Sequence, residues 1–189
     1  GKPIFTNSSA EDGFKINIED LKSKISSKTK FIIINSPNNP TGRVMSKEEL
    51  LQIADLAREN PNINILSDEI YELILKKEFK HYSLSSLAND LKDRIFIING
   101  FAKGWAMTGW RIGYLVGPKD VIKASSALQS QSTSNVCSFV QKGALEALKI
   151  NNEFFSMINS HYDQRRRLLY EGLNNINGIY IEEPNGAFY

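Results

Sequence analysis

One lysine in the chain has neighbours suited to covalent chemistry. Lys103 lies in the glycine-containing run 99–113, directly after the apolar segment Ile95–Ile98. Lysine amines form Schiff bases with carbonyl groups, and an amine removed from water loses its proton more readily. Arg111 follows eight residues later and can bind a phosphate through paired hydrogen bonds. A carbonyl group and a phosphate together indicate pyridoxal 5'-phosphate (PLP) as the ligand.

Two other polar segments also follow apolar runs. Asn35–Gly42 comes after Phe31–Ile34, and Ser67–Tyr71 ends the run Ile63–Leu66. An acid such as Asp68 at the end of a buried strand is costly unless something pairs with it. Open α/β sheets bind their ligands at the carboxyl ends of their strands. We therefore expect these two segments and the lysine loop to form one site.

The order and spacing of these blocks resemble a known family. Asn38–Gly42, Asp68–Tyr71 and Lys103–Gly113 resemble motifs of the class I/II aminotransferases of PLP fold type I, nearest to prokaryotic aspartate aminotransferases. The resemblance covers essentially the whole chain. It implies an α/β fold: a mostly parallel sheet with helices on both faces, as in the PLP-binding large domain. The start of a smaller α+β C-terminal domain is expected to follow.

The resemblance also implies roles for single residues. Lys103 matches the lysine that forms the Schiff base and then moves a proton between the substrate carbon and the cofactor. Asp68 matches the aspartate that pairs with the protonated pyridine nitrogen, so that the ring can accept electrons. Tyr71 and Asn39 match the hydrogen-bond partners of the ring oxygen, with Asn39 also near the substrate carboxylate. Arg111 matches the phosphate-binding arginine.

The phosphate-binding loop departs from the commonest family pattern. Many members have Ser-x-Ser-Lys at the lysine, whereas this chain has Gly100 and Ala102 at the serine positions. A backbone N–H can replace a hydroxyl, so Gly100 stays among the expected cofactor-binding residues. The sequence Gly-x-Ala-Lys resembles that of one prokaryotic branch of aspartate aminotransferases.

The implied function is transamination of an amino acid, aspartate above all, with 2-oxoglutarate. One alternative is another PLP reaction on the same fold, such as a C–S β-lyase or an ACC-synthase-like cyclopropane formation. Another is a non-catalytic, aminotransferase-like regulator domain, which a helix-turn-helix segment upstream would favour. Asp68, Lys103 and Arg111 cannot separate the PLP reactions, because all of them begin with the same linkage to the substrate.

Composition limits the other classes. The chain has 189 residues, 41% hydrophobic residues and a net charge of +2, which gives no reason to expect binding to nucleic acid or membrane. The single Cys137 excludes an internal disulfide, and the absence of a cysteine–histidine cluster argues against a metal site. His81 and His161 are interpreted as surface or packing residues. Without a long apolar run or a signal-like start, a cytoplasmic protein is expected.

Strand-like and helical segments alternate along the first part of the chain, which favours a mostly parallel sheet. Ser46 and Glu49 form a capping box before an apolar helical face. From residue 118 the pattern is mainly helical, over 120–131, 138–149 and a long amphipathic helix, with Arg165–Arg167 as a solvated face. Further strands are expected at Ile112–Val116 and Ile179–Glu182. We expect a PLP-binding domain over 1–158 and the start of the small domain over 159–189.

By comparison with the family, both domains are expected to be partial and the active site incomplete. The opening residues Gly1–Phe5 are strand-like. The polar loop Gln131–Asn135 either caps the next helix or, by resemblance, lies near a dimer interface. Because active sites in the family are shared between subunits, the resemblance implies a homodimer.

Overall fold

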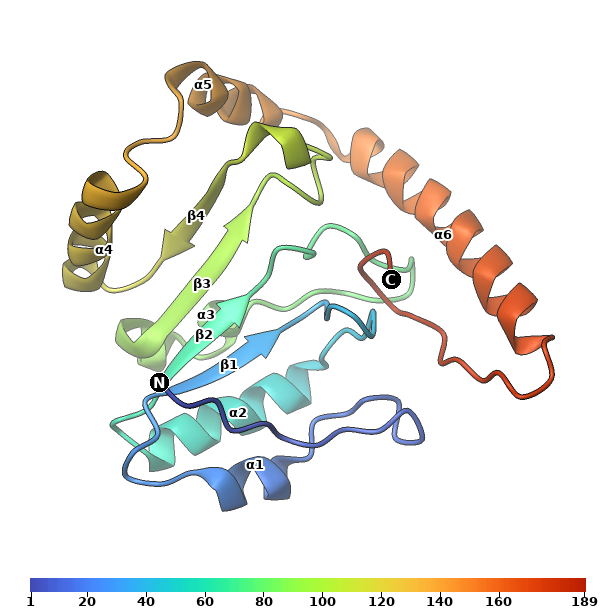
Figure 1. Cartoon of the computed structure of the whole chain (residues 1–189), viewed down its shortest axis with the longest axis horizontal. Helices are drawn as coiled ribbons and strands as arrows, with labels where there is room; N and C mark the ends of the chain where they lie inside the picture. Colours follow the sequence, from blue (N-terminus) through green and yellow to red (C-terminus); the bar gives the residue numbers. More distant parts are fainter.

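The computed structural model describes residues 1–189, and a four-stranded sheet forms its centre (Figure 1). The strands lie side by side in chain order: β1 Phe31–Asn35, β2 Asn64–Asp68, β3 Ile95–Gly100 and β4 Gly113–Val116. β1, β2 and β3 run parallel, whereas β4 is antiparallel to β3. The predicted mostly parallel α/β sheet is confirmed, with one antiparallel edge strand.

Two helices, α1 (Ile18–Lys24) and α2 (Lys47–Glu59), lie on one face of the sheet (Figure 1). The predicted capping box starts α2: Ser46 accepts from the Glu49 backbone N–H, and the Glu49 side chain accepts from that of Ser46. The short helices α3 (Leu84–Leu87) and η1 (Asn89–Arg94) then lead into β3. The apolar residues buried between these helices and the sheet form the largest core cluster, which includes Ile32, Ile34, Leu50, Ile53, Ile65 and Leu84.

The opposite face of β1 is open. Side chains alternate between the two faces of a strand, so Ile32 and Ile34 are buried while Phe31 and Ile33 are 47% and 70% exposed. Helices α1 and α2 therefore cover one face of this part of the sheet. Covering of the other face by helices stays a prediction.

The C-terminal part is helical: η2 Thr108–Trp110, α4 Lys119–Ser132, α5 Ser138–Ala147 and α6 Asn152–Asn174. Ala144 and Ala147 of α5 pack against Phe101 and Met107 and so support the lysine loop. After α6 the chain turns back towards the loops that follow β1 and β2 (Figure 1). No helix combines the length and the apolar character required to cross a lipid bilayer.

Two expected strands are not formed. Residues 1–5 form no strand, and Ile4 and Phe5 are exposed, so the prediction of a strand-like start at Gly1–Phe5 was wrong. The prediction of a strand at Ile179–Glu182 was also wrong. The backbone of Ile181 forms hydrogen bonds with the side chain of Asn174 instead of with a neighbouring strand. Apolar extended residues become a strand only where a partner supplies the hydrogen bonds.

Two details of the helical region also differ from expectation. Arg166 is not solvated with its neighbours: it is buried and forms an ion pair with Asp163 one turn earlier. The loop Gln131–Asn135 does not cap α5, whose N-cap is Cys137 with no side-chain hydrogen bond. Instead α4 continues through Ser132 and ends at Thr133. Burial of Arg166 depends on what packs beside the helix, which periodicity does not reveal.

Candidate active site

The carboxyl ends of β1, β2 and β3 lie at one edge of the sheet and carry the predicted motifs. Asn35, the last residue of β1, is in register with Asp68, the last residue of β2, and Asp68 is in register with Ile98 of β3. Because the three strands are parallel, the loops that follow them start from the same edge (Figure 1). The lysine loop follows β3 directly.

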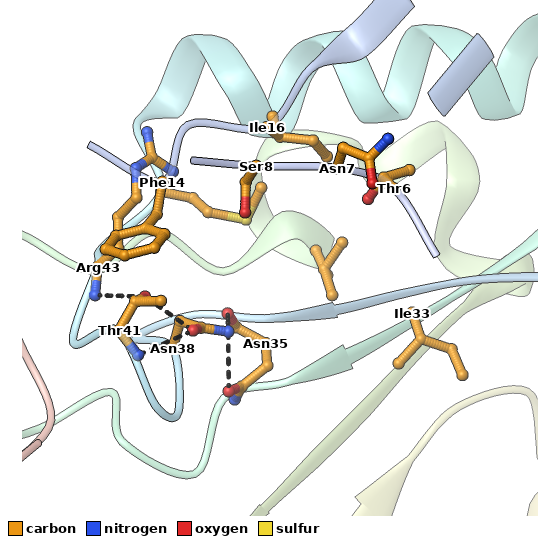
Figure 2. A pocket seen from close by; sticks show the side chains of 12 residues that line it. Thr6, Asn7, Ser8, Phe14, Ile16, Ile33, Asn35, Asn38, Thr41 and Arg43 are labelled. Atoms are coloured by element: carbon orange, nitrogen blue, oxygen red, sulfur yellow. Dashed lines mark hydrogen bonds between the residues drawn. The ribbon is translucent and has the colours of Figure 1, made fainter. Parts of the chain in front are cut away.

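Asn35 fixes the loop after β1. Its Oδ1 accepts from the backbone N–H of Asn39 at 2.7 Å, and its Nδ2 donates to the carbonyl of Asp68 at 3.1 Å. Within the loop, Asn38 Oδ1 accepts from the hydroxyl of Thr41 at 2.8 Å, as Figure 2 shows. Asn35 had no role in the sequence prediction, although its position at the end of a strand was a usable signal.

Beside this loop lies a cavity of about 150 Å³ (Figure 2). Its walls come from Asn35 and Asn38 on one side and from the N-terminal residues Thr6 to Ser8 on the other. None of the residues predicted to bind the cofactor lines it. The cavity is therefore a neighbour of the candidate site and not the site itself.

Lys103 and Tyr71 lie together. Tyr71 is 3% exposed, and Lys103 Nζ lies 5.6 Å from the centre of its ring. Burial is the main cause that raises the pKa of the Tyr71 phenol, helped by its hydrogen bond with Tyr189 and by the charge of Asp68, while the Asn39 amide acts in the opposite direction. Asn39, Asp68, Tyr71 and Lys103 thus form one cluster.

Asp68 is a partly buried carboxylate without a cationic partner. Burial is the main cause that raises its pKa, and the one hydrogen bond that opposes this comes from the backbone N–H of Ile70 at 3.2 Å. No lysine or arginine forms an ion pair with it, although lysines and arginines form seven such pairs elsewhere in the chain. A ligand with a protonated nitrogen would compensate this charge, so the residues present fit PLP.

The contacts of Gly100 and Arg111 give less direct support for the roles predicted for them. A Cβ on Gly100 would lie 2.7 Å from the Cα of Gly113, so the glycine permits β3 and β4 to approach. The Gly100 N–H already donates to Asn99 Oδ1 at 2.7 Å. Arg111 is exposed with a positive φ of 52°, and its guanidinium donates to the Thr108 carbonyl. Phosphate binding by these two residues stays a prediction.

A segment far from these motifs in sequence completes the cluster. The backbone N–H groups of Asn185 and Gly186 donate to the carbonyl of Gly42, and that of Ala187 donates to the carbonyl of Ile74. These bonds hold Phe188 so that its ring centre lies 5.3 Å from Lys103 Nζ. Sequence reasoning had placed these residues in the resemblance but gave them no role at the lysine.

On the other side of β2, a buried polar network surrounds Glu69, which is 2% exposed. Its carboxylate accepts from the hydroxyls of Ser67 and Ser83 and lies 3.2 Å from His81 Nε2. Together with Glu72, these groups place three possible metal ligands within 4.8 Å of one another, which the sequence did not indicate. Both oxygens of Glu69 already have protein partners, so we interpret the network as structural. His81 is thus a packing residue with a defined partner.

Comparison with known proteins identifies the family. The sequence model described as "Aminotransferase class I and II" matches residues 1–189. Over its whole length the chain is 46% identical to the "Probable aspartate/prephenate aminotransferase" of Rickettsia prowazekii, of which it covers 47%. Over its whole length it is also 42% identical to the "Aspartate aminotransferase" of Bacillus sp. (strain YM-2), of which it covers 48%. The chain thus spans about half the length of the curated relatives that it matches.

The fold agrees with this result. The structure superposes on the aspartate aminotransferase from Rhizobium meliloti with a TM-score of 0.95 and 35% identity, covering 99% of this chain and 47% of that one. An aspartate aminotransferase of Thermus thermophilus matches with a TM-score of 0.89 and 40% identity, over 96% of this chain and 47% of that one. Sequence and fold lead to the same conclusion: the chain belongs to the class I and II aminotransferase family.

Proposed function

We propose that the full-length protein is a PLP-dependent aminotransferase in which Lys103 holds the cofactor by a Schiff base. One observation carries the proposal: Lys103 Nζ lies beside the buried Tyr71, within a cluster whose carboxylate, Asp68, has no cationic partner in the protein. Family membership supports it as well.

When bound, PLP supplies an aldehyde and a ring that accepts electrons from the substrate carbon. Asp68 would hold the ring nitrogen in its protonated form, because the two opposite charges stabilise each other at a partly buried position. Tyr71 and Asn39 would donate hydrogen bonds to the ring oxygen, and Arg111 would bind the phosphate.

Lys103 would also act as the base. With the cofactor bound and the lysine displaced by substrate, the free amine of Lys103 would move a proton between the substrate carbon and the cofactor. A positioned general base of this kind contributes roughly 10²–10⁴-fold to a rate. The ring faces of Tyr71 and Phe188 near Nζ favour an amine held in one place.

We propose aspartate as the amino donor and 2-oxoglutarate as the acceptor, because relatives carry the name aspartate aminotransferase. The names of other relatives include prephenate, which makes prephenate a second candidate substrate on the same site. Transamination of 2-oxoglutarate and of prephenate would both use Lys103, so the cluster of Asn39, Asp68, Tyr71 and Lys103 alone favours neither substrate.

The test is a donor and acceptor screen on the full-length protein loaded with PLP, followed by the change in cofactor absorbance. Aspartate should convert the cofactor to its amine form, and 2-oxoglutarate or prephenate should convert it back. Borohydride reduction and peptide mapping should locate the label on Lys103. Label on another lysine, or none, would overturn the assignment.

We further propose a cytoplasmic homodimer, with the PLP-binding domain over 1–158 and the small domain beginning at 159. Light scattering of the full-length protein tests the homodimer, since a dimer has twice the mass of the chain. Limited proteolysis tests the domain boundary, since cleavage is expected at exposed residues near it.

A further inference from the structure

The segment Pro184–Tyr189 is packed too closely at Gly42 to be an incidental neighbour of the lysine. Gly42 has a positive φ of 66°, and a Cβ there would lie 2.4 Å from the Cβ of Pro184. A Cβ on Gly186 would lie 2.8 Å from a methyl of Val44 and 2.9 Å from the Cβ of Pro37. Together with the backbone hydrogen bonds to Gly42 and Ile74, this contact fixes the position of the segment beside Lys103.

The end of the segment carries a tyrosine that reaches the buried Tyr71. The two hydroxyl oxygens are 2.8 Å apart, and the two rings meet edge to face with centres 5.7 Å apart. Tyr71 is 3% exposed, whereas Tyr189 is 43% exposed. Tyr189 therefore supplies a hydrogen-bond partner to a phenol that is otherwise removed from water.

The chemistry of a phenol fixes the direction of this bond once a ligand is present. A tyrosine hydroxyl has one proton to donate and lone pairs to accept with. If Tyr71 donates its proton to an anionic ring oxygen, the remaining bond requires Tyr189 to be the donor. Hydrogen bonds in such a chain polarise and strengthen one another by roughly 10–30% each.

We propose that Tyr189 is a positioning residue for the cofactor: its hydroxyl donates to Tyr71, orients the Tyr71 proton towards the PLP ring oxygen and strengthens that hydrogen bond. The inference rests on the proposed function, because it requires PLP on Lys103. Tyr189 itself need not contact the cofactor. Its effect passes entirely through Tyr71.

The test uses the full-length protein and the variants Tyr189→Phe, Tyr71→Phe and the double variant. The readout is the pH midpoint of the absorbance change of the bound cofactor, measured without substrate, together with the equilibrium constant for PLP binding. A weaker hydrogen bond leaves the ring oxygen more basic, so the chromophore holds its proton to higher pH. Tyr71→Phe should raise the midpoint by about one unit, and Tyr189→Phe by a few tenths of a unit.

The double variant separates positioning from simple packing. If Tyr189 acts through Tyr71, then Tyr189→Phe should produce no further shift when Tyr71 is already phenylalanine. Tyr180→Phe removes the hydroxyl of an exposed tyrosine nearby in the chain and should leave the midpoint unchanged. An unshifted midpoint in Tyr189→Phe, or an equal shift in both backgrounds, overturns the inference.

Failure of the inference is distinct from failure of the proposed function. If the full-length protein binds no PLP, or binds it through another lysine, the proposed function is wrong and no midpoint is measured. If PLP is bound at Lys103 and only the Tyr189→Phe shift is absent, then the function stands and the role of Tyr189 is refuted.

Discussion

Asn35 links two of the predicted motifs: its side chain accepts from the backbone of Asn39 at 2.7 Å and donates to the carbonyl of Asp68 at 3.1 Å. The residue expected near the cofactor ring oxygen and the residue expected at the ring nitrogen are thus held by one amide. This side chain lies at the end of β1, where both loops begin. The spacing between Asn39 and Asp68 is therefore set by the protein before any ligand binds.

Asn35→Ala should loosen this spacing. These two hydrogen bonds and a longer one from Asn38 Nδ2 to Asn35 Oδ1 (3.5 Å) are lost, which should lower the free energy of unfolding by about 1–3 kcal/mol. PLP binding should weaken further than this loss of stability alone accounts for, because Asn39 and Asp68 are no longer aligned. Asn64→Ala removes one longer hydrogen bond, to Lys30, at the far end of β2 and serves as the matched control. Equal PLP affinity in both variants would contradict this role for Asn35.

Gly42→Ala tests the docking of the C-terminal segment. The substitution adds a side chain at a positive φ, which costs about 1–2 kcal/mol, and places it against Pro184, which should cost about 1–3 kcal/mol more. Gly13→Ala has a similar φ of 60° but open space around it, so it carries the backbone cost alone. Urea denaturation of both variants measures the difference. Similar losses would show that the Pro184 contact has little effect on stability.

The sheet and the site could be predicted from the sequence because both depend on local signals. Apolar runs of four or five residues, each followed by a small or polar residue (Asn, Ser or Gly), located all four strands and the loops after them. The capping box at Ser46 and Glu49 also depends only on residues one turn apart. Known family motifs then grouped these loops into one site.

The remaining features depend on contacts that no local pattern contains. The bond between Tyr71 and Tyr189 joins residues 118 positions apart, and it exists because Gly42 and Ile74 hold the returning chain. Likewise, apolar periodicity does not give the direction of a strand, so β4 was found but not its antiparallel pairing. Arg166 reads as one of three adjacent arginines, and only its packing distinguishes it.

Glu69→Ala should be among the most destabilising single substitutions in the chain. It removes the buried acceptor shared by Ser67, Ser83 and His81 and leaves three polar groups without their partner. Breaking a buried network of this type costs about 3–5 kcal/mol. Glu78→Ala, at an exposed glutamate nearby, should change the free energy of unfolding by less than about 0.5 kcal/mol. Chemical denaturation compares the two variants. A small loss of unfolding free energy in Glu69→Ala would show that the network contributes little to stability.

Asp68 should make the cofactor-free protein less stable as the pH rises. Burial raises its pKa, so the folded chain holds this proton more tightly than the unfolded chain, whose value is near 3.8. Stability from this residue is therefore full below the unfolded value and is lost as pH increases through the raised folded value. Glu72 has the same sign, because burial raises its pKa too.

Asp68→Asn should remove this residue's part of the loss. Without PLP, the variant should gain stability relative to the natural protein between about pH 4 and pH 7. With PLP the order should reverse, because the variant has no charge to hold the ring nitrogen and should bind the cofactor more weakly. Thermal unfolding at several pH values, with and without PLP, measures both effects. A variant that is less stable at neutral pH without cofactor would show that the Asp68 charge is compensated within the protein, and so is not reserved for a ligand.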